Sequence, residues 1–238
     1  MSNILPIPST VYNWKNILVV DGVTYTLQKT TLQDKDFVIS CWDEASPNNY
    51  LNKLTDSQYF EKYIINKSLF LTNPLAANIE TMACSVFRRN ETRIGHIQSR
   101  WIVTDGELQV DRIFNHIHKD YRGKGYQKYL MSLGQYGAFA RQGLKSTVKS
   151  KVLDSSIPAK KFNNDIDVTY VETIPNTVFG NLHVFESDET VMTKYVTDKG
   201  LTFSTETEQV DISDSKWATE AVNIARNDSS TAWNREFL

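Results

Sequence analysis

The sequence HKDYRGKGYQKYLM, from His118 to Met131, decides how this chain is interpreted. Arg122, Gly123, Lys124 and Gly125 stand directly before a segment with helical periodicity. A helix N-terminus carries unpaired backbone N–H groups and roughly half a positive charge. Glycines let a bulky anion come close to that backbone, and the two cations add full charges. The stretch therefore predicts a binding site for an anion such as a pyrophosphate.

The stretch does not match the common nucleotide-binding loops. The pattern G-x-x-x-x-G-K-[S/T] is absent, and so is G-x-G-x-x-G. The segments before it read as antiparallel strands, which disfavours a Rossmann unit. Taken alone, an Arg-Gly-Lys-Gly run is also typical of a solvated turn.

Length and composition narrow the class of protein. The chain has 238 residues, 40% of them hydrophobic, which suffices for one good core. Its formal charge is −2, so the whole surface would not attract nucleic acid. Cys41 and Cys84 cannot form a disulfide framework and stand in apolar surroundings, which favours reduced core thiols. No secretory signal or membrane-length apolar run is visible, so we expect a soluble, cytoplasmic protein.

The segments before the opening stretch predict a strand, two helices and a meander. VTYTLQK (23–29) alternates like a strand, and Thr31 with Asp34 caps a helix whose buried stripe is Phe37, Val38, Cys41 and Ala45. A second helix starts near Thr55, with Gln58 completing its capping box and Phe60, Tyr63 and Ile64 facing inward. Three strand-like runs follow at 79–87, 93–103 and 107–117.

The three runs predict an antiparallel meander. RRNET separates the first pair, and Asp105-Gly106 is a strong tight-hairpin signal between the second pair. In the third run the apolar phase slips after Val110. Either both faces are covered there or a bulge interrupts the strand.

A helix from about Lys124 to Gln142 follows, and Gly143 is well placed to end it. Gly134 and Gly137 weaken this helix by roughly 1 kcal/mol each relative to Ala. That loss is reasonable if another element packs closely against both glycines.

The rest of the chain is harder to interpret. Residues 144–180 are polar and basic. NLHVFES (181–187) reads as a strand, Ser187 or Asp188 caps a helix that Gly200 ends, and LTFSTETEQV (201–210) reads as a last strand. The tail carries one amphipathic segment, marked by Trp217, Ala221 and Ile224.

The opening stretch and its surroundings resemble the acyl-CoA-binding signature of the GNAT superfamily of N-acyltransferases. The family pattern, R/Q-x-x-G-x-G/A, lies between the fourth strand and the third helix. Arg122 and Gly125 match it, whereas Gln127 stands where Gly or Ala is usual. The family order is strand, two helices, three antiparallel strands, helix, strand, helix, strand, and it agrees with the order read above. The resemblance covers roughly residues 20–143 and 181–210.

A looser match downstream fixes where the fifth strand is expected. The family has a strand, then Asn-x-x-Ala-x-x-x-Tyr, then Gly-Phe, and Asp188, Val191 and Tyr195 have that spacing. Residues 144–180 then form an insertion. In a competing alignment STVKSKVL is the fifth strand and SIPAKKFNN the next helix, which puts Phe162 at the family's tyrosine and removes the acid. We expect the first alignment because more positions match.

The resemblance implies an α/β (α+β) fold with a mixed, mostly antiparallel central sheet flanked by helices. It also implies an insertion before the fifth strand and a C-terminal extension. In residue numbers, 1–20 are an N-terminal segment, 21–210 are the acyltransferase domain with the insertion at 144–180, and 211–238 are the extension.

The resemblance also implies the activity and the cosubstrate contacts. It predicts an N-acetyltransferase that moves an acetyl group from acetyl-CoA to a primary amine by direct attack. The pantetheine contacts map to the main chain of Asn115, His116 and Ile117, and the downstream match adds Asp188. The pyrophosphate contacts map to Arg122, Gly123, Lys124, Gly125, Tyr126 and Gln127.

Amine acetylation needs a proton acceptor for the nitrogen and a proton donor for the thiolate. The resemblance assigns Asp111 as the base, and the competing interpretation is a surface carboxylate paired with Arg112 or Arg100. It assigns Tyr195 as the acid, and the competing interpretation is a core tyrosine on an amphipathic helix.

Other constellations are weaker. His116 and His118 share a strand face, but a third ligand at suitable spacing is missing, so no metal is expected. The lysines of 145–161 lack the interleaved aromatic residues that stack bases, so no nucleic acid is expected. They would suit the 3′-phosphate of CoA or an acidic partner.

A second function fits the same frame. Gln127, the loosened downstream match and the basic insertion would also suit a catalytically inactive binding or structural protein. Trp217 and Trp233 in the tail could dock a partner or a second copy, which would give a homodimer. The sequence leaves the acceptor open between small-molecule and peptide amines.

Overall fold

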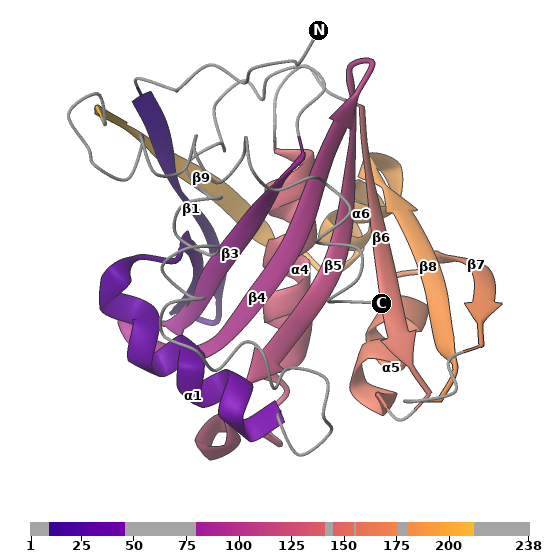
Figure 1. The fold of residues 1–238 in the computed structure, drawn as a ribbon, viewed down its shortest axis with the longest axis horizontal. Coiled ribbons are helices and arrows are strands. Elements are labelled where there is room, and N and C mark those ends of the chain that lie inside the picture. Colours follow the sequence, from indigo (N-terminus) through magenta and orange to yellow (C-terminus); the bar gives the residue numbers. More distant parts are fainter. Residues whose placement is uncertain (1–9, 46–79, 141–144, 155, 176–179, 212–238) are drawn as a thin grey trace, which may run out of the picture.

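The computed structural model describes residues 10–45, 80–140, 145–154, 156–175 and 180–211 (Figure 1). The first half of this part contains the strands β1 (Thr10–Val20), β2 (Val23–Lys29), β3 (Glu80–Arg89), β4 (Thr92–Thr104) and β5 (Glu107–Ile117), with helix α1 (Lys35–Ala45) and the 3-10 turns Leu32–Asp34 and Lys119–Tyr121. The second half contains helix α4 (Tyr126–Phe139), strand β6 (Lys145–Leu153), helix α5 (Ile157–Asp165), strands β7 (Thr169–Ile174) and β8 (Leu182–Asp188), helix α6 (Glu189–Asp198) and strand β9 (Thr202–Asp211).

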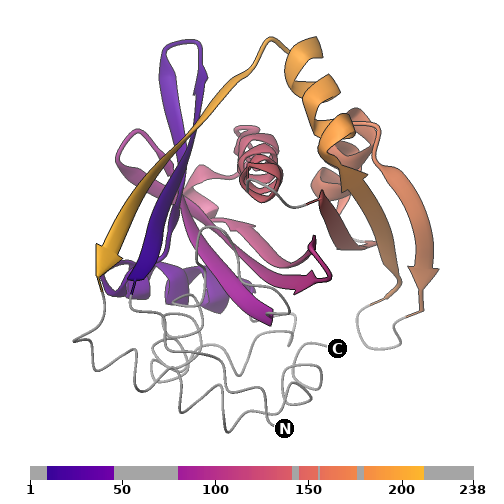
Figure 2. The same ribbon diagram turned by 90° about the horizontal axis from the view of Figure 1, so that it is seen from above.

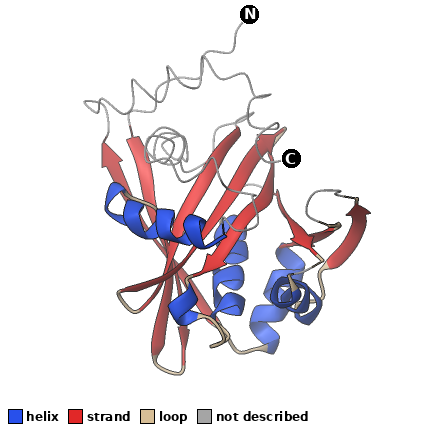
Figure 3. Cartoon of the chain, turned by 60° about the horizontal axis from the view of Figure 1, so that its bottom comes forward, coloured by secondary structure: helices blue, strands red, loops and turns tan. Residues whose placement is uncertain are grey.

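The described strands form one nine-stranded sheet in the order β7-β8-β6-β5-β4-β3-β2-β1-β9. Neighbouring strands are antiparallel except β5 and β6, which run parallel. Helix α1 lies across one face, while α4 and α5 cover the other (Figures 1 and 3). The predicted mixed, mostly antiparallel sheet flanked by helices is confirmed.

The core between α4 and the sheet uses the apolar line of the helix. Leu130 and Leu133 are fully buried against Leu27, Phe87 and Ile97 of the sheet. The two helix glycines allow this close packing. A Cβ atom at Gly137 would collide with the side-chain amide of Asn16, and one at Gly134 would lie 2.9 Å from Cδ1 of Ile97. The predicted close approach at both glycines is confirmed.

Tight turns connect neighbouring strands in the antiparallel half of the sheet. Asp105 and Gly106 have φ of 51° and 81°, as a two-residue hairpin between β4 and β5 requires. The meander β3-β4-β5 is therefore as predicted. Sequence reasoning missed β1, which pairs with β2 through the same kind of turn at Asp21-Gly22. Residues 10–20 thus belong to the sheet, although the predicted segment 1–20 had placed them outside the domain.

The position of the fifth strand corrects the expected alignment. β6 runs parallel to β5 directly after α4, and α5 follows it, so the competing alignment describes this region. The preferred strand, 181–187, falls in β8, which is antiparallel to β6 and does not border β5. Residues 145–174 are therefore part of the sheet and its helical cover rather than an insertion outside it.

The last described strand, β9, returns to the opposite edge of the sheet. After α6 the chain crosses α4, and β9 pairs with β1 at the far edge of the sheet over Thr10–Val19 (Figure 2). Phe203 of β9 stacks on Tyr136 of α4, with ring centroids 4.8 Å apart. Helix α4 is therefore enclosed between the curved sheet and the returning strand.

Several predictions lie outside the described residues. These are the second helix with Thr55, Gln58, Phe60, Tyr63 and Ile64, the stop at Gly143, and the tail with Trp217, Ala221, Ile224 and Trp233. The division of the chain into domain and C-terminal extension stays a prediction.

Candidate functional site

The site is built where β5 and β6 part. The two strands pair from Glu107 with Lys145 to Arg112 with Ser150, and not beyond among the described residues. The remainder, Ile113–Ile117 of β5 and Lys151–Leu153 of β6, separates toward the lower end of the sheet (Figure 1). We call these two segments the strand divergence. Along the strand divergence, the edge of β5 on the β6 side is therefore not paired with β6. This edge lies beside the N-terminus of α4.

A β-bulge lies at the closed end of the strand divergence. Gln98 of β4 pairs with Phe114, while Ser99 pairs with Arg112, so Ile113 is an extra residue in β5. The apolar phase slip in the sequence is explained by this bulge, which is one of its two predicted causes. Bulges bend and twist the strand that carries them, which helps β5 to turn away from β6.

The glycine-rich turn opens directly onto the strand divergence. Gly123 and Gly125 both have φ of 76°, a conformation that favours glycine. A Cβ atom at either position would meet no atom of the described residues within 4 Å, so these residues leave the space in front of the turn open. Gly125 is the N-cap of α4, and no side chain in the described part of the chain caps this helix, whereas Asp188 caps α6 by accepting from Val191 N at 3.0 Å. The first amides of α4 are therefore available to an anion.

The two cations of the turn point elsewhere. The Arg122 guanidinium donates to the carbonyl of Ile117 at 2.9 Å and to Glu44 at 2.9 Å. The Lys124 ammonium donates to the carbonyl of Asp120 at 3.3 Å and lies over the Tyr121 ring. In this conformation the predicted anion site consists of the backbone amides at the start of α4. The charged groups of Arg122 and Lys124 lie to the side of it.

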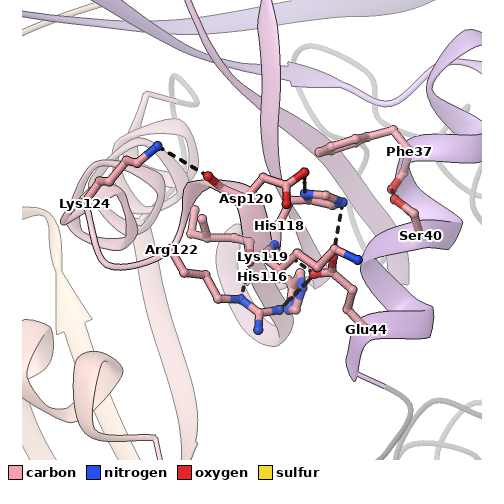
Figure 4. A network of polar contacts seen from close by, with 10 residues as sticks. Phe37, Ser40, Glu44, His116, His118, Lys119, Asp120, Arg122 and Lys124 are labelled. Carbon is pink, nitrogen blue, oxygen red and sulfur yellow. Dashed lines mark hydrogen bonds and ion pairs between the residues drawn. The ribbon is translucent and has the colours of Figure 1, made fainter.

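Glu44 connects α1 to this turn (Figure 4). Its Oε2 accepts from the backbone amide of Lys119 at 3.0 Å and from Arg122 at 2.9 Å, and it lies 2.9 Å from Nε2 of His116. Nε2 of His118 lies 3.1 Å from the other oxygen. Sequence reasoning missed Glu44, because its closest partners stand more than seventy residues away along the chain.

Charge and burial shift the titration of this network. Burial alone would raise the pKa of Glu44, but the hydrogen bonds from His116 and Lys119 and the nearby histidines lower it overall. Burial lowers the pKa of His116, and Arg122 and His118 lower it further, although Glu44 opposes the shift. Glu44 is therefore ionised at neutral pH, and His116 is neutral.

Asn115 of β5 and Gln127 in the first turn of α4 are in contact beside the strand divergence. Gln127 Nε2 donates to Asn115 Oδ1 at 2.5 Å. The side chain that departs from the family pattern thus reaches β5 and leaves the front of Gly125 open. Ile117 and Tyr126 belong to the α4 core, with Ile117 buried and Tyr126 half-buried against it.

The predicted base lies on the α1 side of the sheet, beside the bulge. Asp111 is 8% exposed. Its Oδ2 accepts from Arg100 at 2.6 Å and its Oδ1 from Gln109 at 2.8 Å. The pairing with Arg100 is the one that the competing interpretation named. Both carboxylate oxygens therefore already accept a hydrogen bond.

Tyr195 and Asp188 do not join the other candidates. Tyr195 lies on α6, edge-on to Phe162 of α5 at 6.1 Å, beside a core cluster. These are the surroundings of a core tyrosine. Asp188 caps α6. In the sheet β6 separates β8 from β5, and α6 packs against β8 and α4.

Within the described part of the chain, no three histidine, cysteine, aspartate or glutamate side chains are arranged to hold a metal ion. His116, His118 and Glu44 come together, but an Arg122 nitrogen lies 2.8 Å from His116 and 2.9 Å from Glu44. Cys41 and Cys84 are free and buried, as predicted, and burial raises the pKa of Cys41 to about 12. None of the described helices has the length and apolar character to span a membrane.

No protein-family model matches this sequence, and neither does any curated protein. Solved structures do match. RimJ of Mycobacterium smegmatis in complex with CoA-disulfide has a TM-score of 0.59 and 9% identity, over 79% of this chain and 94% of that one. Spermidine N-acetyltransferase of Vibrio cholerae in complex with CoA and spermine has a TM-score of 0.51 and 12% identity, over 71% and 98%.

A third solved structure, an aminoglycoside acetyltransferase in complex with coenzyme A and kanamycin, has a TM-score of 0.51 and 14% identity. It aligns over 71% of this chain and 98% of that chain. At such low identities these likenesses establish the fold alone. This chain has the GNAT acyltransferase fold.

Proposed function

We propose that this protein is an N-acetyltransferase that transfers an acetyl group from acetyl-CoA to a primary amine by direct attack. The observation that supports it best is the uncapped N-terminus of α4 behind Gly123 and Gly125, at the open end of the strand divergence. Anion-binding amides next to an unpaired strand edge suit a ligand with a diphosphate at one end and an amide-containing arm. Acetyl-CoA has that form.

The residues fit the cosubstrate from one end to the other. The amides from Gly123 to Gln127 would hold the pyrophosphate, with Arg122 and Lys124 as flanking charges. The main chain of Asn115, His116 and Ile117, which is not paired with β6, would pair with the pantetheine amides once Arg122 releases the carbonyl of Ile117. The bulge at Ile113 lies further inward along the same strand, where the thioester would arrive.

Asp111 is the proposed proton acceptor, because it lies beside the bulge on the α1 side of the sheet. An amine nitrogen that attacks the thioester carbonyl must lose a proton, and Asp111 would accept it directly or through water. Both oxygens of this carboxylate already accept hydrogen bonds, one from Arg100 and one from Gln109. Tyr195 stays a predicted proton donor that its contacts do not support.

The acceptor is a small-molecule or peptide amine in this proposal. The likeness to structures that contain spermine and kanamycin supports the amine class without choosing within it. A homodimer also stays a prediction.

One assay tests the activity. The purified chain is incubated with acetyl-CoA and a panel of polyamines, amino sugars and peptides, and release of the CoA thiol is measured. We expect release that depends on one acceptor class, and a fall of about 100-fold for Asp111→Asn with unchanged CoA affinity. Release that no amine stimulates would contradict the proposal.

The second candidate is a CoA-binding protein without transferase activity. The ion pair of Asp111 with Arg100 and the presence of Phe162 where the family has tyrosine favour it. It predicts CoA binding with no thiol release in the same assay.

A further inference from the structure

Four hydrogen-bonded side chains form a second polar cluster, at the β7 edge of the sheet. Asp154 directly follows β6, His183 belongs to β8, and Tyr170 and Thr173 belong to β7. Oδ1 of Asp154 contacts Nε2 of His183. Nδ1 of His183 lies 3.0 Å from the Thr173 hydroxyl oxygen, which lies 2.7 Å from that of Tyr170. We call these four residues the edge cluster. The proposed acetyl transfer uses none of them.

Strand pairing brings the edge cluster together on one face of the sheet. His183 lies opposite Thr173 of β7 and opposite Val152 of β6. Directly opposite residues of antiparallel strands have their side chains on the same face. Alternation adds Asp154, two residues after Val152, to that face. Val152 packs in one cluster with Phe162, so the edge cluster lies on the α5 side of the sheet.

One arrangement of hydrogens satisfies all three contacts of the edge cluster. A carboxylate can only accept, so Nε2 of His183 carries the ring hydrogen and donates to Asp154. In the neutral ring Nδ1 is then an acceptor, and the Thr173 hydroxyl donates to it. The Tyr170 hydroxyl in turn donates to the Thr173 oxygen. The hydrogen bond from His183 lowers the pKa of Asp154, and the Lys160 ammonium, 3.9 Å away, lowers it further, so this carboxylate is ionised at neutral pH.

The edge cluster therefore joins a carboxylate, an imidazole and a hydroxyl in that order, which is the order that activates a hydroxyl as an acyl acceptor. The carboxylate holds the hydrogen on one ring nitrogen, and the other nitrogen can take the hydroxyl proton. Solvent reaches these groups, because the side chains of Asp154 and His183 are 47% and 24% exposed and Tyr170 is 52% exposed. A small reactant can approach the hydroxyl from that side.

We propose that Thr173 is the nucleophile of a second acyl-transfer site, which takes short activated acyl esters or thioesters. His183 acts as its general base, and Asp154 is a positioning residue that holds the imidazole. Tyr170 fixes the Thr173 hydroxyl through its own hydrogen bond. This activity goes beyond the proposed function, because it needs neither the glycine-rich turn before α4 nor an amine acceptor.

The reaction balances in two steps. Thr173 Oγ1 forms a bond to the acyl carbon and gives its proton to His183 Nδ1. The leaving group departs with the electron pair of the broken C–O or C–S bond and takes that proton. Water then attacks the threonine ester with His183 again as the base, which releases the carboxylic acid and restores the Thr173 hydroxyl.

The test uses p-nitrophenyl acetate as the probe. Nitrophenolate release is followed by absorbance, and acetylation of each side chain is mapped over time by mass spectrometry of acid-quenched protein. Thr173→Val removes the hydroxyl, Thr173→Ser keeps one, and His183→Gln removes the base. Thr169→Val is the matched control, because Thr169 is exposed on the same strand and lies opposite Glu186, outside the edge cluster. The thermal midpoint of every variant is measured to show that it is folded.

We expect an acetyl ester on residue 173 of wild type, Thr173→Ser and Thr169→Val. His183→Gln should acetylate Thr173 about 100-fold more slowly, because it lacks the general base. Thr173→Val should lose the share of nitrophenolate release that matches this ester, whereas Thr173→Ser should retain it.

Wild-type protein without an acetyl ester at Thr173 would overturn the assignment. So would a release rate that Thr173→Val leaves unchanged, since His183 or surface lysines would then react with the probe directly. An equal rate of Thr173 acetylation in wild type and His183→Gln would remove the role of the base and with it the proposal. These results are separate from the proposed function, which depends on CoA binding and on an amine.

Discussion

At the scale of single residues, the glycine at the start of α4 combines two demands. Gly125 must adopt a positive φ and must leave the helix amides open to a ligand. An L-residue in this conformation costs about 1–2 kcal/mol, and its side chain projects into the space that the ligand needs.

Gly125→Ala should therefore lose stability and CoA affinity together. Gly22→Ala is the matched control, because Gly22 has φ of 75° and equally open surroundings in the β1–β2 hairpin. Both variants should lose about 1–2 kcal/mol of unfolding free energy. CoA affinity, measured by calorimetry, should fall at least tenfold for Gly125→Ala alone, about 1.4 kcal/mol. An equal CoA affinity in the two variants would contradict the placement of the diphosphate site at the N-terminus of α4.

Glu44 is the second residue on which the turn depends. Its carboxylate joins α1 to His116, Arg122 and the amide of Lys119. A neutral amide cannot satisfy three donors at one oxygen, so part of the network would stay unpaired.

Glu44→Gln should lower the free energy of unfolding by about 1–3 kcal/mol at pH 7, measured by denaturant titration. Glu107→Gln, which removes an exposed pair with Lys145, should change it by less than about 0.5 kcal/mol. The folded protein lowers the pKa of Glu44 below its ordinary 4.5, so the difference from wild type should shrink as the pH falls through that lowered value. Equal losses at pH 7 in the two variants would show that the network has no special weight.

At the scale of elements, the contact between α1 and the sheet contains a buried histidine. His96 of β4 lies between Trp42 of α1 and Phe114 of β5, and neither ring nitrogen has a hydrogen-bond partner among the residues that the structure describes. Burial, and to a lesser degree His116, lowers the pKa of His96 to about 3.

This shift predicts a pH dependence of stability. The unfolded chain binds a proton at His96 near pH 6.5, whereas the folded chain does so only near pH 3. Stability should therefore fall as the pH drops below 6.5, by up to about 1.4 kcal/mol per pH unit. His96→Leu should remove the contribution of this residue and so reduce the slope between pH 6.5 and 5, as followed by denaturant titration, while the lowered pKa of His116 leaves a smaller slope of the same sign. The same slope in both proteins would refute the burial of a neutral histidine.

The contact between α4 and β1 depends on a glycine. Gly137→Ala should raise helix propensity by about 1 kcal/mol, but the added methyl group would collide with Asn16. We expect a net loss of about 1–3 kcal/mol in unfolding free energy, because overpacking outweighs propensity. Asn16→Ala in the same chain should recover part of the loss. Additive losses would mean that the two residues do not meet.

The elements that sequence patterns predicted are those with local signals. Asp105-Gly106, the alternation of 23–29 and the apolar line of α4 each specify their element without distant partners. The fifth strand lacked such a signal, because Ser146 and Ser150 occupy two of the inward positions of β6 and lysines face outward. That pattern is typical of a solvated segment, and only pairing with β5 makes it a strand.

The candidate site shows the same division. The turn from Arg122 to Gly125 could be read from the sequence because its glycines and cations are consecutive. Glu44 could not, since it gains its position from contacts with His116, Lys119 and Arg122, all more than seventy residues away in the chain.

At the scale of the whole molecule, the fold places the N-terminus of α4 beside the point where β5 and β6 separate. Among the strands that the structure describes, eight neighbouring pairs form the sheet, and their single parallel pair, β5 and β6, opens beside the N-terminus of α4. The return of β9 to β1 encloses α4 from the other side and holds the helix in place (Figure 2). The central claim is that the backbone amides at this helix end bind the diphosphate of CoA.

Titration of the isotope-labelled protein with CoA, followed by NMR of the backbone amides, tests that claim most directly. The account predicts saturable shifts that are largest for Gly123 to Gln127 and continue along Asn115 to Ile117. Amides of the β1–β2 turn at Asp21-Gly22 should stay unchanged. Unmoved amides at Gly125 and Tyr126 in CoA-saturated protein, or shifts confined to another part of the sheet, would contradict it.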